Sequence, residues 1–258
     1  MEAYVNGIST RSVDDLVAAM GIDTGIPKSE VSRICAGPDE RVAAFRGRTL
    51  GHVEFPYVYL DATYVHVRDD DLGQVVSRAV VIATGITANG DREVLGVDIG
   101  DSEDETFWTR FCRSLKKRGL GGVRLVISDA HEGLKAAIRR CFQGASWQRC
   151  GVHYARNLLS VVPRAHQQMV AAAFRSVFAL TDPGEIDQRF DEVTELLDSH
   201  GFTKAAASMT AAKTDVLAFS SFPPAHWRKI WSNNPSSGST RRSSAAPTWS
   251  GSSPTTRP

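Results

Sequence analysis

Two aspartates stand at positions where an acidic side chain is chemically unusual. Asp61 lies in the middle of VYLDATYV, a β-branched and aromatic run in which an acid is disfavoured and costly if buried without a partner. Asp129 follows the apolar run LVIS, at the carboxyl end of a predicted buried strand, where open α/β sheets gather their ligands. If the two strands are neighbours, both carboxylates lie at one edge of the sheet.

A pair of carboxylates at such an edge suits hard divalent ions that prefer oxygen ligands, Mg²⁺ or Mn²⁺. Two such ions about 4 Å apart would activate a water or a 3′-hydroxyl and stabilise the leaving oxygen of a phosphodiester. Each aspartate alone also has a structural interpretation, Asp61 as a surface residue of an edge strand and Asp129 as a cap of the following helix. Both interpretations stay open at this point.

A second set of candidate functional residues, a possible metal-ligand pair, lies in QRCGVHYARN. Cys150 and His153 form a C-x-x-H pair, and a zinc site can be imagined from them together with Cys141 and His131. Because there is no second closely spaced pair, we do not expect a closed tetrahedral site, and we interpret Cys150 as mainly a small core residue.

Basic residues offer candidate contacts to DNA. Arg149 and Arg156 flank the C-x-x-H pair and are either phosphate contacts or part of a solvated face. Nearer the N-terminus, KSEVSR reads as the recognition helix of a helix-turn-helix, with Lys28, Ser29 and Arg33 as the candidate DNA contacts. Ordinary helical pairs give the same pattern, so this assignment also stays open.

The order of the predicted helices and strands that position these residues indicates an α/β fold. Residues 1–50 are predicted to be helical, and residues 157–231 form an all-helical segment with helices at 161–180, 183–200 and 203–219. Between them the order is three strands, helix, strand, helix, strand. The predicted strands lie at 55–67, 77–87, 92–100 and 121–130, the predicted helices at 104–119 and 131–142, and residues 145–159 form a short strand that runs into a helix. ANGD between the second and third strands predicts a hairpin.

Composition excludes some classes of protein. The formal net charge of the 258 residues is +1, so any nucleic-acid surface must be a local patch. Four scattered cysteines fit a reducing cytosol better than a secreted disulfide scaffold. No run of about 18 apolar residues is present, and the start MEAYVNGISTRSVDD does not fit a signal peptide. We therefore expect a cytoplasmic protein with no membrane partner.

Five blocks of the sequence, in this order and spacing, resemble the Mutator-type transposases of bacterial insertion sequences. The blocks are YLDATYVHVR, VLGVDIGDSEDETFW, VISDAHEGLKAAIRR, WQRCGVHYARNLL and HWRKIWSNNP. The similarity covers nearly all of residues 1–235. The stretch from Asp129 through Gly133 to the C-x-x-H pair resembles the signature of the family, with minor departures at Cys141 and Gln143.

The resemblance implies an RNase H-like core with an Asp-Asp-Glu triad, in which Asp61 is the first acid and Asp129 the second. It implies Mg²⁺ or Mn²⁺ as cofactor, DNA as partner (terminal inverted repeats and target DNA), and homo-oligomers in active members. The implied domains are a helix-turn-helix-like segment at 1–50, the core at 55–156 and a helical insertion at 157–231. Family members also carry a longer N-terminal region, so we expect this chain to be truncated there.

The third acid of the triad has no counterpart in the sequence. In the family, NP is followed by a helix of the form LERLNKEI, whose Glu completes the triad, whereas here NNP is followed by SSGSTRR. The last acidic residue of the chain is Asp215. Glu185, Glu192 and Glu195 lie on predicted insertion helices, and we interpret them as solvated charges.

A shifted reading frame accounts for this loss. Synonymous codons can be chosen for residues 236–258 so that one base added before them gives LERLNKEIKRRTDVVGVVPDDPA. We therefore hypothesise a single-base deletion near Pro235, which makes residues 232–258 a disordered, out-of-frame tail and this copy inactive. Two alternatives are a non-catalytic DNA-binding remnant of a transposase and an unrelated RNase H-like nuclease.

Overall fold

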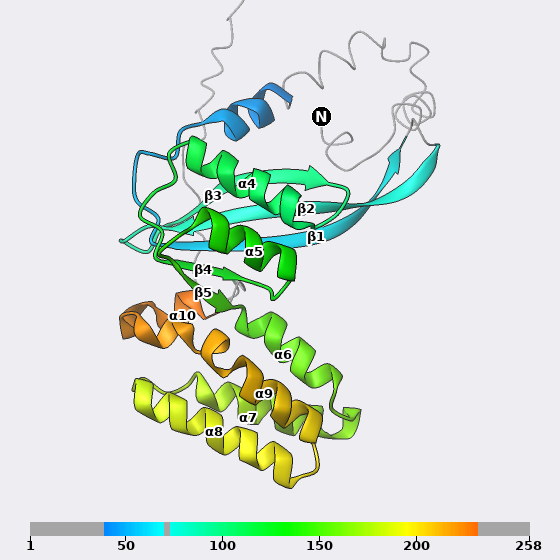
Figure 1. Cartoon of the computed structure of the whole chain (residues 1–258), viewed down its shortest axis with the longest axis vertical. Coiled ribbons are helices and arrows are strands. Elements are labelled where there is room, and N and C mark those ends of the chain that lie inside the picture. Colours follow the sequence, from blue (N-terminus) through cyan, green and yellow to red (C-terminus); the bar gives the residue numbers. More distant parts are fainter. Residues whose placement is uncertain (1–38, 70–72, 232–258) are drawn as a thin grey trace, which may run out of the picture.

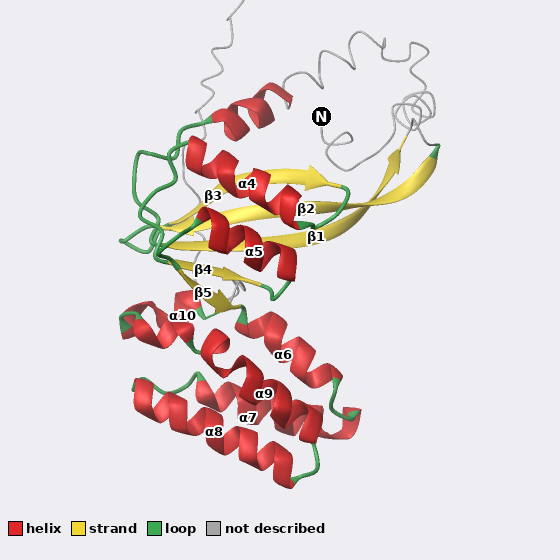
Figure 2. Ribbon diagram, viewed as in Figure 1, coloured by secondary structure: helices red, strands yellow, loops and turns green. Residues whose placement is uncertain are grey.

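The chain folds as a mixed α/β protein (Figures 1 and 2) in a computed structural model that describes residues 39–69 and 73–231. The strands are β1 (Tyr57–Asp69), β2 (Gln74–Ile86), β3 (Arg92–Gly100), β4 (Leu125–Ser128) and β5 (Ser146–Arg149). The helices are α4 (Glu105–Lys117), α5 (Glu132–Cys141), α6 (Gly151–Ser160), α7 (Gln167–Val177), α8 (Pro183–Ser199), α9 (Thr203–Val216) and α10 (Trp227–Ile230). Residues 39–47 are also helical. The predicted DNA contacts Lys28, Ser29 and Arg33 and the predicted tail at 232–258 lie outside the described residues.

The five strands form one mixed sheet in the order β3-β2-β1-β4-β5. β1, β2 and β3 pair antiparallel, whereas β4 and β5 continue the sheet parallel to β1. The predicted hairpin between β2 and β3 is confirmed, with Gly90 at a positive φ of 85°. β1 is the central strand, but its pairing with β4 ends at Leu60, so at Asp61 it pairs only with β2.

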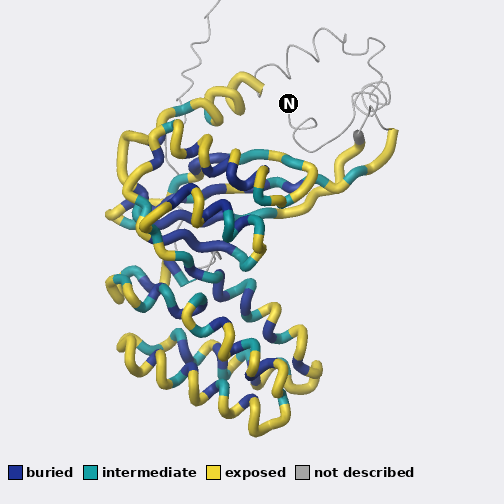
Figure 3. The backbone as a smooth tube through the Cα atoms, viewed as in Figure 1, coloured by how far each residue is buried: buried dark blue, intermediate teal, exposed yellow. Residues whose placement is uncertain are grey.

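The two faces of the sheet belong to two hydrophobic cores, because strand side chains alternate between the faces. We name the first the α4 face; its strand residues include Val58, Leu60, Val81, Ala83 and Val126, and they pack against α4 and α5. We name the second the α6 face; its strand residues include Tyr57, Tyr59, Leu125 and Ile127, and they pack against the helical segment that begins with α6. Figure 3 shows the buried strands between these layers and the exposed outer ends of β1 and β2.

The helical segment differs from its prediction at one place. A single helix over residues 161–180 is wrong, because α6 ends at Ser160 and α7 begins at Gln167, after a short 3-10 turn. Pro163 lies in this break; it has no N–H to donate and its ring clashes with a preceding helical turn. In the part of the chain that the structure describes, no helix is both long and apolar enough to cross a membrane.

The helical segment returns to the sheet at its end. The Tyr57 hydroxyl lies 2.6 Å from His226 Nδ1, and the Tyr59 hydroxyl donates to the backbone carbonyl of Lys229. Buried Gln148 on β5 donates to the carbonyl of Val216 at 2.6 Å and accepts from the N–H of Phe219 at 2.8 Å. These contacts fix the helical segment against β1, which carries Asp61, and against β5.

We expect Gln148→Leu to lower the free energy of unfolding by about 2–4 kcal/mol, because the carbonyl of Val216 and the N–H of Phe219 would stay buried without partners. Chemical denaturation measures the change. Gln143→Leu is the matched control, since Gln143 is exposed and its loss should change stability by less than about 0.5 kcal/mol. Equal effects of the two substitutions would contradict the role of Gln148.

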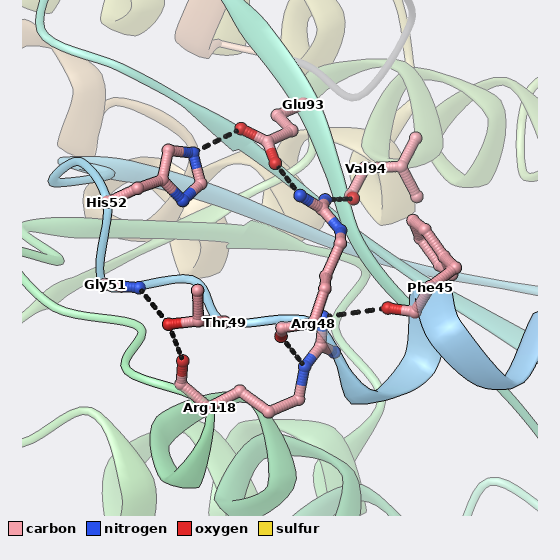
Figure 4. A network of polar contacts seen from close by, with 8 residues as sticks. All are labelled: Phe45, Arg48, Thr49, Gly51, His52, Glu93, Val94 and Arg118. Atoms are coloured by element: carbon pink, nitrogen blue, oxygen red, sulfur yellow. Dashed lines mark hydrogen bonds and ion pairs between the residues drawn. The ribbon is translucent and has the colours of Figure 1, made fainter.

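A polar network joins the helix before the sheet to β3 and α4 (Figure 4). Arg48 pairs with Glu93 on β3. Arg118, just after α4, donates from Nε to the carbonyl of Arg48 at 2.8 Å and from a terminal nitrogen to the carbonyl of Phe45 at 3.3 Å. The end of helix 39–47 is therefore held beside the C-terminus of α4.

Candidate active site

Asp61 and Asp129 emerge side by side from neighbouring parallel strands. β1 and β4 pair with Leu60 opposite Ser128, so the next residue on each strand is one of the two aspartates. The residue two positions before each aspartate belongs to the core of the α6 face. Because strand side chains alternate, both carboxylates are directed to that face. The predicted convergence of the two acids is therefore what the register produces.

Asp129 does not cap the helix that follows it. Its Oδ1 accepts from the N–H of Ala130 at 2.7 Å, whereas α5 begins after His131 and has no side-chain cap. The carbonyl of Asp129 accepts from the buried Ser128 hydroxyl at 2.9 Å, and Trp147 Nε1 donates to that hydroxyl at 2.9 Å. The capping interpretation is wrong, and the side chains around Asp129 fix the end of β4 instead.

His153 stands beside the two carboxylates at the start of α6. β5 pairs in parallel with β4, and the N–H of Cys150 donates to the carbonyl of Ser128 at 2.7 Å, so β5 ends next to Asp129. One turn later, His153 Nε2 lies 4.0 Å from Asp61 Oδ1. Three parallel strands thus bring Asp61, Asp129 and His153 to one place.

The pKa of His153 is raised above its ordinary value. The largest cause is a hydrogen bond with the Cys150 side chain, and the negative charges of Asp61 and Asp129 add to it, while burial acts in the opposite direction. The C-x-x-H spacing therefore places a thiol and an imidazole together at the site.

We expect an NMR titration to find the pKa of His153 above the usual histidine value, and Cys150→Ala to lower it more than Asp61→Asn or Asp129→Asn does. Because the native pKa is raised, protonated His153 stabilises the fold fully below the pKa of the unfolded chain. This contribution is lost as the pH rises through the native pKa. An unchanged pKa in all three variants would contradict the arrangement.

The four residues of the imagined zinc site do not come together. Cys141 on α5 packs in the core of the α4 face, where its thiol forms a hydrogen bond with the thiol of Cys112. Cys150 packs in the core of the α6 face, on the other side of the sheet. The interpretation of Cys150 as a core residue is confirmed by its 1% exposure.

The two predicted phosphate contacts differ in their surroundings. The guanidinium of Arg149 lies 4.7 Å from the centre of the Tyr154 ring, so much of its position is set by packing. Arg156 is exposed on α6, three residues after His153 and therefore on the same side of the helix. A role in binding DNA stays a prediction for both.

The residues present fit a divalent cation only in part. Two carboxylates provide the hard oxygen donors that Mg²⁺ or Mn²⁺ prefers. Among residues 39–69 and 73–231, no group of three His, Cys, Asp or Glu side chains is placed to hold a metal ion. Asp61 and Asp129 would hold one ion loosely, with water completing its coordination.

The glutamates considered as substitutes for the third acid lie elsewhere. Glu185, Glu192 and Glu195 are exposed on α8, and Glu192 pairs with Arg189 at 3.0 Å. Figure 1 places α8 on the far side of the helical segment from the sheet. Their interpretation as solvated charges is confirmed.

The last described residue lies next to the site. The N–H of Gly151, the first residue of α6, donates to the carbonyl of Trp231 at 2.9 Å. A β-carbon at Gly151 would come within 2.5 Å of the Trp231 ring, so only glycine permits this contact. The chain beyond Trp231 therefore starts beside the C-x-x-H pair and close to the two aspartates.

The α6 face is left apolar and exposed beyond Asp61. Ile82 on β2 is opposite Asp61 and is 38% exposed. Val94 and Ile99 on β3, which follow the same face by register, are 43% and 59% exposed. A sheet surface of this kind is typical of a face on which another element packs.

The chain is similar in sequence to known proteins. A family model described as "Transposase, Mutator family" matches residues 1–241. The chain is 40% identical over 232 residues to the transposase for insertion sequence element IS1081 of Mycobacterium tuberculosis, covering 90% of this chain and 55% of that protein. It is 39% identical over 235 residues to the transposase for IS406 of Burkholderia multivorans (90% and 59% covered). It is 36% identical over 222 residues to the transposase for IS256 in Tn4001 of Staphylococcus aureus (85% and 56% covered). The chain thus spans somewhat more than half the length of these relatives.

Proposed function

Since the chain belongs to the Mutator family of transposases, we propose that it descends from an enzyme that cuts and rejoins DNA by metal-dependent phosphodiester transfer. Its substrates in this proposal are the terminal inverted repeats of an insertion sequence and a target DNA, and its active form is a homo-oligomer. The proposed core is RNase H-like, and it acts in the cytoplasm.

The observation that carries the proposal is the placement of Asp61 and Asp129 on adjacent parallel strands, directed to the same face. Mg²⁺ or Mn²⁺ bound there would supply the activation of a water or 3′-hydroxyl and the stabilisation of the leaving oxygen. The two carboxylates hold the ion, and His153, 4.0 Å from Asp61, is placed to orient that carboxylate.

The third acid belongs, in our proposal, to the segment that should follow Trp231. The structure supports this in two ways: that segment starts beside the site, and the α6 face next to Asp61 exposes Ile82, Val94 and Ile99. An amphipathic helix such as LERLNKEI could cover this surface with its leucines and bring a carboxylate toward the two aspartates. Residues 236–258 contain no acid that could do so.

The nucleotide sequence of the locus tests the frame hypothesis. We expect a reading frame shifted by one base near the codon of Pro235 that encodes LERLN and its continuation. A locus in which no alternative frame encodes that segment would overturn the hypothesis, while leaving the assignment of Asp61 and Asp129 intact.

An assay of the purified chain tests the function itself. With the terminal repeats of its own element and Mg²⁺ or Mn²⁺, we expect binding of the DNA without cleavage or strand transfer. Metal-dependent cleavage by the chain as it stands would refute the claim that the third acid is missing, and failure to bind DNA at all would count against the proposed substrate.

A second candidate function is that of a non-catalytic DNA-binding remnant that occupies element ends or joins active multimers. The observation that favours it is the absence of any acidic residue after Asp215. Inhibition of an active relative by added chain, in proportion to its occupancy of the terminal repeats, would support this candidate.

A further inference from the structure

A hollow of about 320 Å³ lies between α4 and α5, on the outer side of the α4 face. Its lining residues are Glu105, Thr106, Thr109, Arg110, Arg113 and Arg140. Three arginines around one hollow are a concentration of positive charge in a chain whose net charge is only +1. Because α4 and α5 lie across the sheet from Asp61 and Asp129, this hollow is separate from the candidate active site.

The charges of the hollow are only partly neutralised. Arg140 pairs with Glu105 at 2.8 Å, and Arg110 lies 3.9 Å from Asp98 with its guanidinium 5.2 Å from the centre of the Phe107 ring. Arg113 is exposed and has no hydrogen bond or ion pair to any of the residues described. The lining of the hollow therefore has a net positive charge, and the guanidinium of Arg113 is available to bind an anion.

A buried hydroxyl in the wall of the hollow also lacks a partner. Thr109 is 6% exposed, and its Oγ1 makes no hydrogen bond within the described structure. A threonine on a helix ordinarily donates to a backbone carbonyl of the preceding turn, so an unpaired buried hydroxyl is costly. Because this oxygen is closed off from the hollow, it is not available to an anion, and binding falls to the arginines of the lining.

The positive surface continues along α4. Arg110, Arg113 and Lys117 follow one another at spacings of three and four residues, so they share a side of the helix. Lys117 borders a second hollow, of about 520 Å³, together with Arg118 and Gly47. Arg118 itself is fixed by its hydrogen bonds to the carbonyls of Arg48 and Phe45 (Figure 4). Together the two hollows flank a basic stripe about 10 Å long.

We propose that the α4–α5 hollow is a binding site for a backbone phosphate of duplex DNA, with Arg113 as its main contact. Arginine donates two N–H groups in a fixed fork that matches phosphate oxygens, and phosphate contacts position DNA without reading its sequence. That the polyanion is DNA rests on the proposed function; the site itself rests on the three arginines that line the hollow.

Fluorescence anisotropy with a labelled duplex tests the site, using the full chain. Arg113→Ala should weaken binding about 5–10-fold near 0.1 M salt and reduce the slope of log Kd against log salt by about one. Arg175→Ala is the matched control, because Arg175 is an exposed arginine on α7, away from the hollow, and should leave the salt slope unchanged.

Thr109→Val is a second control. It removes a hydroxyl that is closed off from the hollow and keeps the shape of the side chain, so DNA binding should be unchanged while the midpoint of thermal unfolding stays the same or rises. Inorganic phosphate should compete with DNA only at far higher concentration. Equal binding by wild type and Arg113→Ala would overturn the site and leave the proposed function standing, whereas no DNA binding by any of the proteins would overturn both.

Discussion

A chain in which LERLNKEIKRRTDVVGVVPDDPA replaces residues 236–258 is expected to gain metal-dependent cleavage of its terminal repeats. The replacement supplies a carboxylate at a point where the backbone leaves Trp231 beside the two aspartates, and it supplies apolar side chains for the exposed α6 face. Gel analysis of labelled repeat DNA, incubated with Mg²⁺ or Mn²⁺, detects the products.

The aspartates provide the control for this gain. In the restored protein, Asp61→Asn or Asp129→Asn should lower the cleavage rate by about 10³-fold, since each removes a ligand of the ion that stabilises charge at the reacting phosphate. Asp98→Asn should have little effect, because Asp98 pairs with Arg46 on the α4 face. A restored protein that cleaves equally well without Asp61 would exclude the proposed site.

The second large effect is expected at Gly133, the residue that lets α5 approach the start of α4. A β-carbon there would lie 2.8 Å from the backbone nitrogen of Glu105 and 3.1 Å from the carbonyl carbon of Asp104. Alanine in a helix is ordinarily about 1 kcal/mol more favourable than glycine. The clash is with backbone rather than with a flexible side chain, so it should outweigh this gain, and Gly133→Ala should destabilise the fold by about 1–3 kcal/mol.

Gly47→Ala gives the comparison for that experiment. No atom lies within 4 Å of a β-carbon built at Gly47, so this substitution should be neutral or slightly stabilising in the same thermal or chemical unfolding measurement. If Gly133→Ala is equally harmless, the close approach of α4 and α5 is not a constraint on the fold.

The elements of the core could be predicted from sequence because their patterns are local. β-branched runs mark β1 and β2, ANGD marks the hairpin after β2, and the apolar spacing of DETFWTRFCRSLKKRG marks α4. The apolar spacing does not predict the break before α7, because it continues on both sides of Pro163. The order of strands in the sheet could not be predicted, since it depends on contacts between distant segments.

Only the part of the candidate site that has a local signal could be predicted from the sequence. Asp61 was recognisable as an acid within a β-branched strand and Asp129 as the end of a buried one. The sequence presents His153 only as a partner of Cys150, because the C-x-x-H spacing does not reveal that β5 ends beside β4. The arginine-lined hollow depends on the packing of α4 on α5, to which Gly133 contributes, and spacing along one helix does not reveal it.

The most direct test of the central claim is the location of Mn²⁺ on this chain by paramagnetic broadening of NMR signals. If Asp61 and Asp129 hold the ion, signals of His153 and Ser128 should broaden first as Mn²⁺ is added, and Asp61→Asn or Asp129→Asn should abolish that broadening while Asp98→Asn does not. Broadening that is centred elsewhere, or that survives in both aspartate variants, would contradict the account.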